Sequence, residues 1–239
     1  MPDMSRLRSW AESFAGSQPA ASAKSVLVIG LGRFGTALAE TLGELGIEVM
    51  AVDVDQALVD EWADKIPHVR VADATSSTVL TQLGAASFDA IVVAIGTDIE
   101  ASVLSTAALA DMGVSNIWAK AITAEHGRIL ELVGADEVVF PEKEMGERVA
   151  HVVTGQVDDY FEIDDGFVLA ELKAPRELVG LPLAETDLRA KYQVTVVCIK
   201  PEGGSFTYAT ADTVVGEGDL LVIAGSVEAA DRFVDKTSR

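Results

Sequence analysis

The chain has 239 residues, of which 38 are acidic and 18 are Lys or Arg, so its formal net charge is −20. Non-specific binding to nucleic acid or anionic lipid needs a basic face, so we exclude both as direct partners. Hydrophobic residues make up 49% of the chain, yet no apolar run reaches the roughly 18–20 residues of a membrane helix, and we expect a soluble protein. The single cysteine, Cys198, has no internal disulfide partner and is compatible with a reducing cytoplasm.

Residues 1–24 are expected to form a separate tail whose second half, rich in Ser, Ala and Gly, is typical of a flexible link. Its apolar residues recur at helical spacing: Met4, Leu7, Trp10, Ala11 and Phe14. Two interpretations stay open, a short amphipathic helix that docks on a partner and a partly disordered leader. The second is favoured because so short a helix is marginal alone. The tail lacks the continuous apolar segment of a secretory signal.

Strands and helices alternate strictly through residues 25–141, which we take as the first domain. The predicted strands are 25–29, 48–53, 69–72, 89–94, 116–121 and 137–140, and the predicted helices are 35–45, 56–65, 77–83, 99–112 and 125–133. Short loops between alternating elements require parallel crossover connections. The prediction is therefore an α/β fold with a doubly wound, Rossmann-type parallel sheet.

The pattern changes after Pro141. A connecting helix is expected within residues 142–158, and residues 159–239 are predicted to form a small α+β domain. Its expected strands are 161–163, 168–172, 194–200, 207–209 and 219–224, with short helices at 182–191 and 227–234. A domain of about 80 residues lies near the lower size for independent stability, so dimerisation through it is expected.

The first strand leads into a glycine-rich turn, Gly30-Leu31-Gly32-Arg33-Phe34-Gly35, which opens the first helix. This strand–turn–helix context is the one that a dinucleotide-binding fingerprint requires. Gly30 permits the tight turn, Gly32 lets the backbone approach a pyrophosphate, and Gly35 lets helix and strand pack closely. The helix N-terminus then presents free N–H groups and a positive dipole end to the phosphates.

The second strand ends at Asp53, followed by Val54, where an acidic residue bonds the ribose hydroxyls of a bound nucleotide. A carboxylate at this position repels a 2′-phosphate, so we expect an unphosphorylated adenosine ribose. The alternative role for Asp53 is a cap of the next helix, but Asp55 is the better placed residue for that role.

Further candidate binding residues follow the ends of other strands, where ligands of such sheets bind. They are Asp73, Ala74 and Thr75 after the third strand, Ala94, Ile95 and Gly96 after the fourth, and Lys120 at the end of the fifth. Arg33 and Lys120 are candidate phosphate cations. Each also has a plain alternative, a solvated surface charge for Arg33 and an exposed strand-end lysine for Lys120.

These segments, together with Asn116-Ile117-Trp118-Ala119-Lys120 and Pro141-Glu142-Lys143-Glu144-Met145-Gly146, resemble the RCK (regulator of potassium conductance) family. The resemblance covers residues 25 to about 235 and is strongest to the cytosolic regulatory subunits of bacterial Ktr potassium transporters. It implies dimers assembled into an octameric ring beneath a potassium-translocating membrane protein. It also implies that ATP and ADP bind the first domain and change the shape of the ring.

The resemblance further assigns roles to individual residues. Arg33 is similar to the arginine that touches the terminal phosphate, and Asp53 to the ribose acid. Asp73 departs from the family pattern, which often has Asn, and this weakens the expected adenine contacts. Glu142 looks like the glutamate that binds a cation (Mg²⁺, Ca²⁺ or Na⁺) near the phosphates, at the interface of two subunits. From the residues alone it is an acidic side chain that stabilises a helix start.

The second domain resembles the RCK C-lobe, which in relatives binds cyclic di-AMP at its dimer interface. The matching residues are Leu188, Arg189 and Ala190, where an arginine would pair with a phosphate and apolar neighbours would hold adenine. The alternative is that Arg189 is a helix-surface residue and that the lobe only dimerises.

A nicotinamide-dependent dehydrogenase or an NAD(H)-binding redox sensor would use the same fold and fingerprint. Against an enzyme, His68, His126 and His151 stand in no recognisable catalytic pattern. The chain also lacks a phosphate-binding lysine loop of the kind that ATP hydrolases use. We therefore expect a binding protein rather than an enzyme, with NAD(H) sensing as the alternative.

Overall fold

The computed structural model describes residues 24–154, 157–164 and 166–237. Except for Lys24, the predicted tail lies outside the described residues, so its two interpretations remain untested. The chain divides into two compact units, the first ending at Pro141 and the second beginning at Glu142. Across the described residues, no helix combines the length and the hydropathy needed to cross a membrane.

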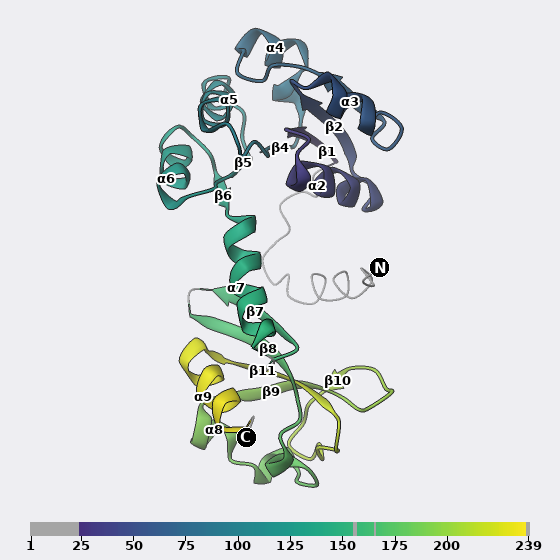
Figure 1. Ribbon diagram of the computed structural model, residues 1–239, viewed down its shortest axis with the longest axis vertical. Helices are drawn as coiled ribbons and strands as arrows, with labels where there is room; N and C mark the ends of the chain where they lie inside the picture. Colours follow the sequence, from purple (N-terminus) through teal and green to yellow (C-terminus); the bar gives the residue numbers. More distant parts are fainter. Residues whose placement is uncertain (1–23, 155–156, 165, 238–239) are drawn as a thin grey trace. The chain divides into compact units, whose positions relative to one another are not determined.

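The first unit is built on a six-stranded sheet with the strand order β3-β2-β1-β4-β5-β6 (Figure 1). Every neighbouring pair in this sheet is parallel. The strands are β1 (Ser25–Ile29), β2 (Glu48–Asp53), β3 (His68–Val71), β4 (Ala90–Val93), β5 (Ile117–Lys120) and β6 (Glu137–Val139). The doubly wound α/β fold expected from the alternating pattern is confirmed.

Helices cover both faces of this sheet because side chains alternate along each buried strand. The helices are α2 (Arg33–Glu44), α3 (Gln56–Trp62), α4 (Ser77–Gln82), α5 (Ile99–Asp111) and α6 (Ala124–Leu132), with a 3₁₀ turn at Ala85–Ser87. Val26 and Val28 of β1 pack in one core with α2 and α3. Leu27 and Ile29 face the opposite core, to which α4, α5 and α6 contribute Leu80, Leu109 and Leu130. Because consecutive strands are joined by these helices, all six strands end at the same edge of the sheet.

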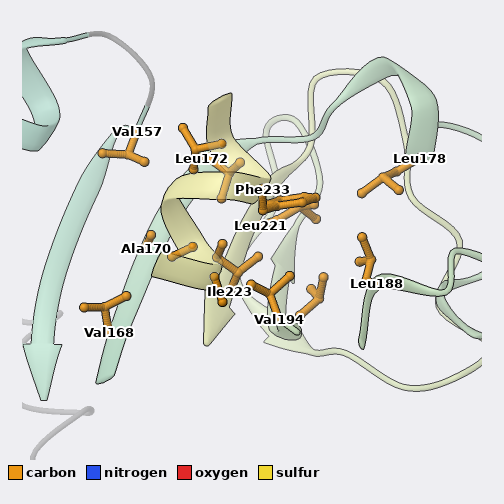
Figure 2. Close-up of a cluster of buried hydrophobic side chains, with 14 of the residues drawn as sticks. Val157, Val168, Ala170, Leu172, Leu178, Leu188, Val194, Leu221, Ile223 and Phe233 are labelled. Atoms are coloured by element: carbon orange, nitrogen blue, oxygen red, sulfur yellow. The ribbon is translucent and has the colours of Figure 1, made fainter. Parts of the chain in front are cut away.

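The second unit contains a five-stranded antiparallel sheet with the order β10-β9-β11-β8-β7. Its elements are α7 (Pro141–Val153, beginning at the last residue of the first unit), β7 (Asp159–Asp164), β8 (Phe167–Lys173), 3₁₀ turns at Arg176–Leu178 and Leu183–Glu185, α8 (Leu188–Tyr192), β9 (Thr195–Lys200), β10 (Thr207–Tyr208), β11 (Leu220–Ser226) and α9 (Val227–Thr237). Its core lies between the sheet and α9: Figure 2 shows Phe233 of α9 directed among Leu172 and Leu221. The predicted small α+β domain is confirmed in its fold class.

One predicted element of the second unit is wrong in form. A single helix was expected over residues 182–191, but the chain forms a 3₁₀ turn and then the short helix α8. Between them Asp187 has a positive φ of 53°, a left-handed conformation that Asp tolerates better than most residues and that no helix interior allows. The single predicted helix is therefore interrupted at Asp187.

Contacts within the second unit attach α7 to β7. Arg148 donates two hydrogen bonds of 2.7 Å to the carboxylate of Asp159 and lies 4.2 Å from the centre of the Phe161 ring. One turn later, His151 stacks on Tyr160 with ring centres 3.7 Å apart. Burial raises the pKa of Tyr160 to about 12. The C-terminal half of α7 is therefore fixed to the second sheet.

Candidate functional site

The three glycines of the turn after β1 have different surroundings. Gly30 has a φ of +103°, and a Cβ there would lie 3.2 Å from the backbone of Ala94. A Cβ on Gly35 would collide with the carbonyl oxygen of Gly30. Gly32, in contrast, has no atom within 4 Å of the place where its Cβ would be. The fold itself requires the first and last glycines, whereas the open space at Gly32 suits the close approach of a ligand to the backbone.

Helix α2 begins directly at this turn and offers its N-terminus to the same space. Gly32 is the N-cap residue, no side chain caps the helix, and no acidic residue stands in its first turn. The exposed Arg33 and the half-buried Phe34 are its first two residues. An uncapped helix N-terminus with a cation and no carboxylate is a favourable place for a phosphate group.

The Asp53 carboxylate faces the glycine turn from the end of β2. One oxygen accepts a hydrogen bond of 2.6 Å from the backbone N–H of Leu31, and the other accepts one of 2.9 Å from Asp55. The neighbouring Val54 is 69% exposed. Asp55 in turn caps α3 by accepting from Ala57 at 2.8 Å, so the expected division of roles between the two aspartates is confirmed for the cap.

The segment after β3 forms a turn that is held by its own hydrogen bonds. Asp73 accepts hydrogen bonds from the backbone N–H of Thr75 at 3.0 Å and from its hydroxyl at 2.7 Å. The hydroxyl of Thr75 and then its N–H hold the pKa of Asp73 below its usual value. Ala74 is buried against the core. Asp73 therefore stands as a charged residue in a preformed turn at the strand-end edge.

The segment after β4 and the end of β5 meet at Lys120. Ala94 is buried and donates to Ile29 of β1 at 2.7 Å, which ties the two strand ends together. A Cβ on Gly96 would lie 3.1 Å from the Nζ atom of Lys120. That ammonium is 5.8 Å from the centre of the Phe34 ring, and Lys120 is only 8% exposed. The strand-end lysine is thus a buried residue, not the exposed one of the plain alternative.

The predicted binding residues of the first unit are therefore gathered at one edge of its sheet, because β3, β2, β1, β4 and β5 are neighbours in that order. Glu142 is a separate case. It lies exposed in the first turn of α7, within the second unit. Over the described ranges, no group of three or more His, Cys, Asp or Glu side chains forms a complete metal site.

The second unit holds a cavity of about 390 Å³ that Leu188, Arg189 and Ala190 all line. Arg189 donates from Nε to the hydroxyl of Thr195 at 3.0 Å, which leaves the two terminal nitrogens of its guanidinium to project beyond that bond. Thr195, Thr186 and Thr210 also line the cavity. Sequence reasoning missed these three threonines because they come from separate loops and strands, and only the fold brings them together.

Sequence reasoning also missed the environment of His126, at the start of α6. It is 2% exposed, its Nδ1 accepts from the backbone N–H of Ile122 at 3.4 Å, and burial lowers its pKa. Its Nε2 atom is buried and has no hydrogen-bond partner in the part of the chain that the structure describes. Ile122 lies in the loop that directly follows β5, so this histidine supports the loop behind Lys120.

Comparison with known families gives two matches that follow the two units. The TrkA-N domain matches residues 26–141, and the TrkA-C domain matches residues 167–237. Two relatives come from Bacillus subtilis strain 168. "Ktr system potassium uptake protein C" is 40% identical over 88% of this chain and 96% of its own length. "Ktr system potassium uptake protein A" is 36% identical over 88% of this chain and 95% of its own length.

Among solved structures, "Crystal Structure of the GsuK RCK domain" matches with a TM-score of 0.52 and 25% identity over 99% of this chain. The structure "GsuK Channel" matches with a TM-score of 0.63 and 19% identity over 95% of this chain, which shows the common fold. This chain spans 50% and 42% of the length of those two structures. The paired domains and the relatives of nearly equal length show that the chain belongs to the RCK family, with a TrkA-N domain followed by a TrkA-C domain.

Proposed function

We propose that this chain is the regulatory subunit of a Ktr-type potassium transporter, and that it senses ATP and ADP in its TrkA-N domain. The observation that carries the proposal is the identity of 40% and 36% to two Ktr system potassium uptake proteins over at least 95% of their length. In this proposal the chain works in the cytoplasm, at the inner face of the membrane, through a potassium-translocating partner. It binds its nucleotide and does not turn it over.

The strand-end edge of the first sheet supports the nucleotide part of this proposal. The phosphates lie over the open backbone at Gly32 and the uncapped N-terminus of α2. Asp53, already tied to the turn through Leu31, presents its remaining lone pairs to the ribose hydroxyls. The turn at Asp73 and the buried Ala74 border the adenine side.

Gating then requires that ATP and ADP differ in their affinity for one shape of the ring. A ligand shifts a conformational equilibrium only by its differential affinity for the two states. The third phosphate of ATP supplies that difference through Arg33 and through a cation (Mg²⁺, Ca²⁺ or Na⁺) bound by Glu142 at the interface of two subunits. Hard cations prefer carboxylate and phosphate oxygens together, so the nucleotide itself completes the cation site. We place these subunits in dimers that form an octameric ring.

The cavity beside α8 supports a second ligand, cyclic di-AMP. Arg189 lines this cavity and is oriented by Thr195, and a guanidinium held in this way suits a phosphodiester. Leu188 and Ala190 supply apolar contacts for an adenine ring.

The alternative function is NAD(H) sensing. A structure titled "GsuK channel bound to NAD" matches this chain with a TM-score of 0.50 at 24% identity, a likeness of fold alone. The glycine turn and Asp53 suit NAD as well as ATP. The two functions differ in what they need beyond the pyrophosphate, a third phosphate with its cation or a nicotinamide ring.

Calorimetric titration of the purified chain with ATP, ADP, NADH and cyclic di-AMP, with and without magnesium, tests the proposal. We expect ATP and ADP to bind more tightly than NADH, and we expect magnesium to strengthen the binding of ATP. Glu142→Ala should remove the magnesium effect, while Glu147→Ala, an exposed position on the same helix, should keep it. Tighter binding of NADH than of either adenosine phosphate would replace the proposal by the alternative.

A further inference from the structure

His126 is a buried histidine that the proposed nucleotide site does not use. It is 2% exposed and lies in the first turn of α6. Its Nδ1 atom accepts a hydrogen bond of 3.4 Å from the backbone N–H of Ile122, so the neutral ring carries its proton on Nε2. That Nε2 atom is buried and has no partner among the described residues. A buried N–H without an acceptor is rare, because it costs the folded state stability.

A second proton on this ring conflicts with its surroundings in two ways. A protonated Nδ1 is a donor and no longer accepts from Ile122, so two N–H groups would face each other. The new charge would also be buried without a counter-charge, since His126 forms no ion pair within the described ranges. Burial accordingly lowers the pKa of His126.

The elements around His126 supply no buried carboxylate to compensate that proton. The elements packed against α6 in the described part of the chain are α5, β5 and β6. Because side chains alternate along a strand, Lys120 of β5 and Glu137 of β6 belong to the sheet face away from α6. The buried polar side chains of α5 are uncharged hydroxyls, those of Ser102, Ser105 and Thr106. The charged side chains of α5 and α6 are all exposed: Glu100, Asp111, Glu125, Arg128 and Glu131.

The hydrogen bond to Ile122 connects His126 to the strand-end edge of the sheet. Ile122 lies in the loop after β5, and a Cβ on Gly96 would lie 3.5 Å from its Cγ2 atom. The segment after β4 also touches the glycine turn, because a Cβ on Gly30 would lie 3.3 Å from the side chain of Ile95. Contacts therefore run from His126 through the loop after β5 and the segment after β4 to the turn that precedes α2.

We propose that His126 is a pH sensor for the nucleotide site, and that its protonation releases the loop after β5 and weakens nucleotide binding. The neutral ring holds Ile122 in the arrangement that the nucleotide binds. Below the ordinary histidine pKa of about 6.5, a growing share of the chains carries the second proton and binds nucleotide less tightly. The inference rests on the proposed binding of ATP and ADP, and adds control by acid pH.

The experiment compares dissociation constants for ADP at pH 7.5 and pH 5.5 in the natural chain and two variants. His126→Asn keeps an acceptor near the position of Nδ1 and cannot be protonated in this range. His68→Gln is the matched control, since His68 is an exposed histidine of the same domain. All three proteins share any effect that comes from protonation of ADP itself. Thermal unfolding at both pH values checks that each protein is folded.

We expect acidification to weaken ADP binding by about threefold more in the natural chain and His68→Gln than in His126→Asn. NMR titration of His126 in the natural chain is a second measure, which decides alone if His126→Asn fails to fold. There ADP should lower the pKa of His126, because a ligand that prefers the neutral ring must hold it neutral.

An equal effect of pH on the natural chain and folded His126→Asn, or a pKa of His126 that ADP leaves unchanged, would overturn the role of His126. Either result would leave the proposed function intact. A natural chain that does not bind ADP at pH 7.5 would instead overturn the proposed function.

Discussion

Single residues at the glycine turn separate what the fold needs from what a ligand needs. Gly30 and Gly35 face backbone atoms that leave no room for a side chain, whereas the space at Gly32 is open. The sequence alone identifies the three glycines as one nucleotide-binding motif, because a strand precedes the turn and a helix follows it. The sequence does not show that Leu31 is bonded to Asp53 or that Lys120 is buried, because both depend on how separate strands pair.

Arg33→Ala is expected to keep ADP binding and to lose the discrimination between ATP and ADP. Arg33 is exposed at the start of α2, so its truncation should change the free energy of unfolding by no more than about 0.5 kcal/mol. Titration with both nucleotides measures the effect, with Arg128→Ala, an exposed arginine on α6, as the control. A variant that prefers ATP as strongly as the natural chain does would show that Arg33 does not contact the terminal phosphate.

Thr195→Val is expected to weaken cyclic di-AMP binding by about tenfold, the effect of losing roughly 1.4 kcal/mol. Valine has the same shape as threonine but cannot accept the hydrogen bond from Arg189 Nε. Thr195→Ser should restore most of the affinity, which a purely structural role of the threonine methyl would not explain. Calorimetry on the three proteins provides the measurement, and equal affinity in the valine variant would contradict the role of this bond.

At the scale of elements, the sequence predicts every strand of both sheets to within a few residues. The buried strands of the first sheet are short, nearly continuous apolar runs between turn signals, and such runs leave little choice of structure. The failure at residues 182–191 has a specific cause. Asp187 adopts a left-handed conformation and is the N-cap residue of α8. An aspartate is a typical N-cap residue, so a helix start after Asp187 could have been read from the sequence, whereas its left-handed backbone could not. The cavity residue Thr210 follows β10, far from α8 in the sequence, and only the fold shows that both line one cavity.

Helix α6 gives the first domain a pH dependence. Burial lowers the pKa of His126, so the folded domain binds fewer protons than the unfolded chain near the ordinary histidine value of about 6.5. Its contribution to stability is complete above that value and is lost as the pH falls below it. Urea unfolding at pH 7.5 and pH 5.5 should show a larger loss for the natural chain than for His126→Gln. Equal losses would mean that His126 is not buried as a neutral group.

At the scale of the whole molecule, two domains of one chain are proposed to bind two ligands. Thermodynamic linkage then makes any coupling reciprocal, typically with about 1–3 kcal/mol between sites. The attachment of α7 to β7 through Arg148 and Asp159 ties the helix at the domain boundary to the second sheet. The family, TrkA-N followed by TrkA-C, was evident from motifs in both halves of the sequence. The ring and its response to nucleotide depend on contacts between chains, which one sequence does not reveal.

The most direct test of the central claim is potassium uptake into proteoliposomes that contain a Ktr-type membrane protein, with and without this chain. The account predicts that uptake differs between ATP and ADP only when the chain is present. It also predicts that Arg33→Ala, which removes the discrimination between ATP and ADP, reduces this difference, whereas Arg128→Ala preserves it. Uptake that is identical in ATP and ADP with the natural chain bound would contradict nucleotide-controlled regulation.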